Sequence, residues 1–135
     1  MQKKGNQVAG IFAYEQYIFD DPLELDDAII IVDICRNFGT IDHVIVRNSE
    51  SGPEAYNAYI TDTDGFANGC HPIPEDEYIS SVGFTLLRAD GSCSITILYD
   101  LNSICFRHFK GQDLGIDQFA VYLEKELKKR KKASR

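Results

Sequence analysis

The feature that most constrains the fold is an Asp-Gly turn between two runs of alternating apolar residues. Residues 79–88 and 92–100 form these runs, and Ala89, Asp90 and Gly91 lie between them. An Asp-Gly pair readily adopts the positive backbone angles of a tight hairpin turn. Alternation of apolar and polar side chains buries one face of each strand. The segment therefore predicts an antiparallel β-hairpin.

Four other segments have strand character. Residues 8–19 mix aromatic and β-branched side chains and predict a first strand, whereas residues 41–47 and 55–61 flank a Gly-Pro turn and predict a second hairpin. Residues 103–109 add one strand, and residues 62–74 are rich in turn-forming residues and predict a loop.

Residues 22–37 carry the signals of a helix. Asp21 would cap its start, Pro22 suits the first helical position, and Gly39 supplies a stop. Asp26 and Asp33 fall on one narrow polar stripe, which predicts a helix buried over most of its circumference. Residues 28–32 are mostly β-branched and would also suit a buried strand. Both interpretations stay open, with the helix favoured.

A last helix is predicted from residue 116. Apolar side chains recur at helical spacing, Asp117 lies near the start, and lysines cluster at the end, as the helix dipole favours. Residues 128–135 are expected to fray into a basic tail. The order of elements predicts a single α+β domain over residues 1–135, with a mainly antiparallel sheet of about five or six strands and two helices packed on it.

Composition excludes several classes of protein. The longest apolar stretch has five residues, whereas a membrane-spanning helix needs about 20. No secretion signal follows the first residues, so a cytoplasmic location is expected. The four cysteines show no paired spacing, which favours reduced, mostly buried thiols over two disulfides.

Candidate chemical motifs are incomplete. The segment Asp62-Thr63-Asp64-Gly65 resembles the middle of a calcium loop, but Ile60 and His71 stand at the first and twelfth ligand positions. Cys70 and His71 are adjacent and cannot easily chelate one zinc ion. No phosphate-binding loop or nucleophile motif occurs. We therefore expect no enzyme activity, no metal and no cofactor.

The charge is unevenly distributed along the chain. Residues 1–124 carry 20 acidic and 7 basic side chains, and residues 125–135 carry 7 basic and 1 acidic. An acidic body attracts basic protein surfaces and repels nucleic acid and anionic membranes. A basic protein partner is therefore expected, with no nucleic acid or membrane partner, and a monomer is favoured.

The order of elements over residues 11–60 resembles that of bacterial immunity proteins, small acidic antidotes of contact-delivered toxins. The likeness covers the first strand, the helix that begins with acidic residues, the β-branched strand, the turn at Gly52-Pro53 and the strand that contains the tyrosines. It implies stoichiometric, non-catalytic binding of a basic toxin domain, often a nuclease, by blocking its active surface.

Two alternatives remain open. The hairpin from Val82 to Ile97 is similar to one in type III secretion chaperones, which would imply a homodimer that binds an effector segment. Those chaperones usually begin with a helix, whereas this chain is expected to begin with a strand. A small enzyme without a recognisable motif is the other alternative.

Partner contact is predicted where acidic groups lie beside tyrosines, because carboxylates steer association and tyrosines supply contact area. The predicted contact residues are Asp26, Asp33, Glu54, Tyr56, Tyr59, Asp62, Asp64, Glu75, Asp76, Glu77 and Tyr78.

Overall fold

The computed structural model describes residues 1–49, 56–69 and 79–133. The described elements follow one another as β1 (Gln2–Ala9), β2 (Phe12–Ile18), α1 (Asp27–Cys35), β3 (His43–Ser49), β4 (Tyr56–Asp62), α2 (Thr63–Ala67), β5 (Ser81–Arg88), β6 (Gly91–Leu98), β7 (Ser103–Phe109) and α3 (Ile116–Ala133).

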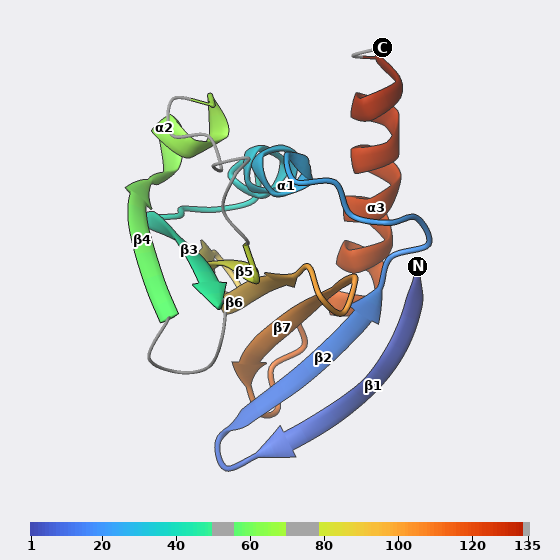
Figure 1. Ribbon diagram of the computed structural model, residues 1–135. Helices are drawn as coiled ribbons and strands as arrows, with labels where there is room; N and C mark the ends of the chain where they lie inside the picture. The colour runs from blue at the N-terminus through green and yellow to red at the C-terminus, as the bar shows by residue number, and fades with distance from the viewer. Residues whose placement is uncertain (50–55, 70–78, 134–135) are drawn as a thin grey trace.

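One antiparallel sheet organises the chain, with strand order β1-β2-β7-β6-β5-β3-β4. Helices α1 and α3 lie on the same side of this sheet, as Figure 1 shows. The core lies between these layers and includes the buried Ile104 and Phe106 of β7 and Leu123 of α3. The predicted α+β class is confirmed, and the sheet contains seven described strands instead of five or six. No helix in the described parts is long and apolar enough to cross a bilayer.

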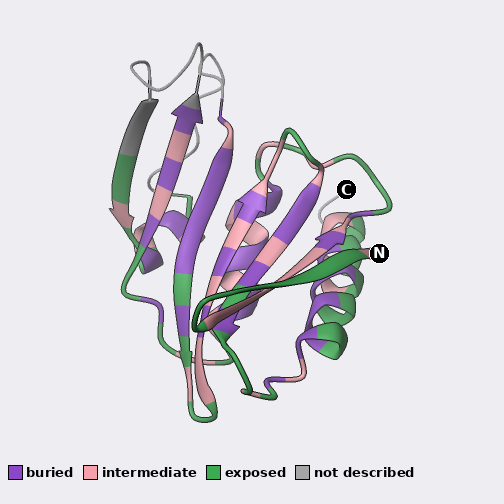
Figure 2. Ribbon diagram, turned by 90° about the horizontal axis from the view of Figure 1, so that it is seen from below, coloured by how far each residue is buried: buried purple, intermediate pink, exposed green. Residues whose placement is uncertain are grey.

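The predicted first strand, residues 8–19, is part of a hairpin. Strand β1 ends at Ala9, the chain turns at Gly10, and β2 returns antiparallel to β1. Gly10 has φ +62°, a backbone conformation that other residues rarely adopt. The prediction was wrong here because apolar residues on both sides of the glycine made the turn look like continuous strand. Figure 2 shows β1 exposed over most of its length.

The two other hairpins are confirmed. Strands β5 and β6 pair from Ser81↔Leu98 to Arg88↔Gly91, which places the turn at Ala89 and Asp90. Strands β3 and β4 also pair antiparallel. Strand β7 has the predicted bounds, and it pairs with both β6 and β2.

Residues 28–32 are helical, which resolves the ambiguity at this β-branched run. The helix begins at Asp27 and not at Pro22, because the preceding segment is held by a residue from the turn between β6 and β7. The Asn102 side chain accepts a hydrogen bond from the Leu23 backbone N–H at 2.7 Å and donates to the carbonyl oxygens of Phe19 and Asp21. These bonds fix residues 19–23 in a non-helical path.

Helix α3 continues to Ala133, so residues 128–133 of the expected frayed tail are helical. The predicted apolar stripe is confirmed, with Ile116, Phe119, Ala120, Leu123 and Leu127 buried. The basic residues near the end lie against acidic residues of the segment before α1 and of α1 itself, as described below.

Candidate functional site

The predicted contact residues fall into three groups in the structure. Tyr59, Asp62 and Asp64 lie on β4 and α2, whereas Asp26 and Asp33 lie at the start and in the middle of α1. Tyr56 belongs to β4, but its side chain is not among those described. The remaining predicted residues, Glu54, Glu75, Asp76, Glu77 and Tyr78, lie outside the described residues.

Strand β4 is a terminal strand of the sheet. Among the described strands it pairs only with β3, so its other edge has no described strand beside it. Tyr59 is 44% exposed and Ile60 is 72% exposed. A strand edge presents backbone N–H and C=O groups that can pair with another chain, and exposed apolar side chains favour such pairing. Tyr59 and Ile60 point to opposite faces of the sheet, so a strand added at this edge would meet an apolar side chain on each face.

Asp62 and Asp64 stand where β4 passes into α2. The Asp62 side chain accepts a hydrogen bond from the Gly65 backbone N–H at 2.8 Å and caps the helix. Thr63 donates to the Ile41 carbonyl oxygen at 2.6 Å, and Phe66 is fully buried, which anchors α2 to the core. The calcium-like sequence is thus the start of a short helix, because a carboxylate satisfies its free N–H groups.

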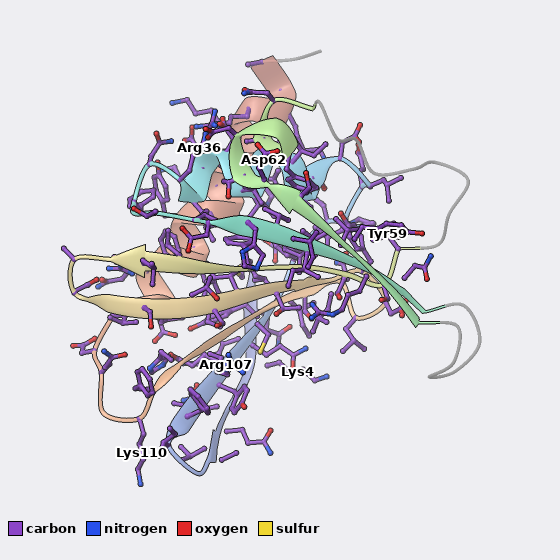
Figure 3. All side chains as sticks on the ribbon, turned by 90° about the vertical axis from the view of Figure 1, so that its left-hand side faces the viewer. Lys4, Arg36, Tyr59, Asp62, Arg107 and Lys110 are labelled. Atoms are coloured by element: carbon purple, nitrogen blue, oxygen red, sulfur yellow. The ribbon has the colours of Figure 1, made fainter. Side chains whose placement is uncertain are left out.

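Arg36 connects two of the predicted acidic residues. Its guanidinium lies 2.7 Å from an oxygen of Asp33 and 3.1 Å from an oxygen of Asp64. Figure 3 shows Arg36 on the helix side of the molecule, near Asp62. Asp33 also contacts Arg130 of α3 at 2.6 Å. Asp64 keeps an exposed side chain, but Asp33 links α1 to α3 through Arg130 and also pairs with Arg36, so it is less available to a partner.

The C-terminal basic residues neutralise acidic groups near α1. Lys131 lies 3.1 Å from the buried carboxylate of Asp27 and 3.2 Å from Glu24, and Lys128 lies 3.3 Å from Asp20. This contact region lines a groove of about 1110 Å³ between residues 19–27 and α3. Because carboxylates and ammonium groups pair within it, the groove has little net charge to attract a charged ligand. Asp26, the other residue at α1 that is predicted to contact a partner, has an exposed side chain.

A second polar cluster lies under β1 and β2, beside a cavity of about 500 Å³. His108 Nε2 lies 2.8 Å from Glu15, and Lys3 donates to both Glu15 and Asp117, at 3.0 and 2.8 Å. Tyr17 donates to Asp117, and the hydrogen bond from Lys3, followed by that from Tyr17, lowers the pKa of the Asp117 carboxyl. Sequence reasoning missed this cluster because its residues come from four distant segments with no common motif.

The cluster is better suited to stability than to catalysis. His108 is 8% exposed, and its Nδ1 lies 2.9 Å from the Phe109 carbonyl oxygen while Nε2 faces Glu15. With both ring nitrogens engaged, neither is free to take a proton from a substrate. Burial and then the hydrogen bond to Asp117 raise the pKa of Tyr17, which keeps its hydroxyl protonated.

The described cysteines are poor nucleophiles. Cys35 and Cys93 are buried free thiols, and burial raises the pKa of Cys93 to about 12. The thiolate is the reactive form, so such a thiol is unreactive near neutral pH. Within residues 1–49, 56–69 and 79–133, no group of three or more His, Cys, Asp or Glu side chains has the arrangement of a metal site.

Comparison with known proteins returned no relative: no protein-family model, curated protein or solved structure matches this chain.

Proposed function

We propose that this chain is a non-catalytic binding protein, of the immunity type, that neutralises a basic toxin domain by covering its active surface. The observation that carries this proposal is the edge of β4, where exposed Tyr59 and Ile60 lie beside the exposed carboxylates of Asp62 and Asp64. This edge offers apolar contact area, backbone pairing groups and negative charge on one continuous segment.

The mechanism follows from the chemistry of the two partners. A nuclease is basic where it holds phosphate groups, so carboxylates placed there compete for the same charges and accelerate association. Charge alone gives loose binding, and affinity comes from a few well-packed anchors such as tyrosine. We assign the anchoring to Tyr59 and Ile60 and the steering to the acidic residues at the end of β4.

The same strand edge supports a second candidate, a secretion chaperone. An extended client segment can add to a free sheet edge by backbone hydrogen bonds. The two candidates differ in stoichiometry, because an immunity protein binds one folded toxin domain one to one, whereas the chaperone would bind its client as a homodimer.

The proposal is tested with the product of the reading frame next to this gene, the expected position of a toxin. Co-expression with this chain should restore growth of cells that produce the toxin domain, and light scattering should show a one-to-one complex. A neighbouring product that is not toxic, or that forms no complex, contradicts the immunity proposal. A complex with two copies of this chain would support the chaperone.

The binding surface is tested by Ile60→Lys. This change adds a positive charge at the β4 edge and should speed dissociation of the complex by at least about tenfold, the size of one lost hot-spot contact. The matched control is Val121→Lys, on the exposed side of α3, where the side chain is 57% exposed. Equal effects of the two changes in surface plasmon resonance would show that β4 is not the interface.

A further inference from the structure

The sheet face opposite to the helices carries no acidic side chain over five strands. We define this open face by the β2 residues Phe12, Tyr14, Gln16 and Ile18. On β7, β6, β5 and β3 it continues through the residues that pair with these positions from strand to strand, and through every second residue along each strand. Side chains in register share a face. The protein has 21 acidic residues, and none of them occupies these positions. No described helix covers this face (Figure 1).

Three exposed cations lie at the β1, β2 and β7 end of the sheet: Lys4, Arg107 and Lys110. Figure 3 shows them in the same lower part of the molecule, away from Arg36 and Asp62. The ion pairs found among the described residues do not involve any of the three. In contrast, the lysines and arginines at residues 128, 130 and 131 of α3 all contact carboxylates. The fold thus separates paired charge on the helix side from three cations at the other end of the sheet that form no ion pair among the described residues, and Arg107 is the one of these that lies on the open face.

Arg107 is held in a fixed position by its neighbours. Its guanidinium lies 4.7 Å from the centre of the Phe12 ring, and one nitrogen donates to the Ser94 hydroxyl at 3.2 Å. Phe12 in turn stacks on Phe109, with ring centres 5.5 Å apart, and Phe109 is 46% exposed. A guanidinium stacked on an aromatic ring keeps its remaining N–H donors in a planar fork that matches a carboxylate.

We propose that the open face around Arg107 binds an acidic, carboxylate-bearing segment of a partner protein. Charge complementarity identifies this occupant, since the positions that define the face hold Arg107 and the exposed Phe109 ring and no carboxylate. The acidic groups on the helix side lie behind the sheet. Salt at physiological ionic strength largely screens charges that are more than about 8 Å apart, so these groups weaken the attraction of an acidic segment to the open face only slightly. The surface is distinct from the β4 edge and does not depend on the function proposed for that edge.

Single-stranded nucleic acid is a less suitable occupant. Base stacking needs free aromatic faces, whereas the Phe12 ring packs against Arg107 and Phe109, and the Phe109 ring is itself partly covered by Phe12. A nucleic-acid strand longer than this small cationic area would also be repelled by the rest of the protein, because the net charge of the protein is −7. A short acidic peptide needs only the local cations.

The test uses labelled hexaglutamate, which spans about 20 Å when extended. Its fluorescence anisotropy should rise saturably with added protein, and identically labelled hexaglutamine should not bind. Arg107→Glu should weaken hexaglutamate binding by at least about tenfold, because it replaces a charge-assisted contact by repulsion. The matched control is Lys129→Glu, the same change of charge at an exposed position of α3.

A second variant separates loss of binding from loss of fold. Lys4→Glu combined with Lys110→Glu changes only exposed side chains, so it should keep the native circular dichroism spectrum and still weaken binding. Three results would overturn the proposal: no saturable binding of hexaglutamate, an equal loss with Lys129→Glu, or tighter binding of hexauridylate than of hexaglutamate.

Discussion

At the scale of single residues, Asn102 shows how one side chain determines the path of a distant segment. Its backbone has φ +49°, in the left-handed region, and its side chain bonds to the backbone of three residues between positions 19 and 23. Asparagine tolerates this conformation better than most residues. The sequence around Asp21 and Pro22 predicts a helix start, and the bonds from Asn102 override that local preference.

Asp117 gives a prediction about pH. Hydrogen bonds from Lys3 and Tyr17 lower the pKa of its carboxyl from the ordinary value of 3.8. A lowered folded-state pKa stabilises the fold fully above that ordinary value, and the contribution is lost as pH falls through the folded-state pKa. We expect Asp117→Asn to lower the free energy of unfolding near pH 6, and the difference from wild type to shrink at low pH.

Urea denaturation at a series of pH values measures this difference. Asp42→Asn is the control, because Asp42 is exposed and takes part in no ion pair found among the described residues. A difference between wild type and Asp117→Asn that does not change with pH would show that the ionised carboxyl is not the source of the stability.

At the scale of elements, ion pairs join the end of α3 to the rest of the fold. Asp27 is almost completely buried, and Lys131 supplies a charged partner at 3.1 Å. A carboxylate left buried without its partner is strongly destabilising, whereas loss of an exposed lysine costs little. The ion pair between the start of α1 and the end of α3 therefore holds these two helices together.

Lys131→Ala should lower the free energy of unfolding by about 2 kcal/mol, because it leaves the Asp27 carboxylate without this charge. Lys129→Ala, two residues away and exposed, should change it by less than about 0.5 kcal/mol. Chemical denaturation of the two variants measures both values. Similar small effects would mean that the Lys131 pair contributes no stability.

The candidate site shows the same division between local and distant information. Residues 55–61, in which Tyr and Ile alternate with small residues, predict a strand, and the structure confirms it as β4. That β4 is a terminal strand of the sheet depends on its place beside β3, which no local pattern encodes. Asp33 is predicted as a contact residue from its charge, but Arg36 and Arg130 engage it. The Glu15–His108 pair joins residues 93 positions apart and has no local signal.

At the scale of the whole molecule, one core connects both halves of the sheet to the helices. The fully buried Phe106 of β7 packs edge-on against Tyr17 of β2 and against Phe119 of α3. Because an interior strand of the sheet, its neighbour β2 and helix α3 meet at this side chain, we expect the described elements to unfold together.

Phe106→Ala should lower the free energy of unfolding by about 3–5 kcal/mol, the usual effect of a large cavity in a packed core. Phe109→Ala removes the same atoms from the same strand on the open face and should cost less than about 1 kcal/mol. Urea transitions followed by circular dichroism and by tyrosine fluorescence should coincide in the wild type. Separate transitions would contradict a single cooperative unit.

The sequence by itself determined the features that depend on neighbouring residues. The Asp-Gly turn predicted the β5–β6 hairpin, and helical spacing predicted the buried stripe of α3, because both signals act over a few residues. Tertiary structure alone decided the strand order, the late start of α1, the pairing of the basic residues of α3, and the open face without carboxylates. Each of these depends on contacts between residues far apart in the chain, whose energies appear only when the layers pack together.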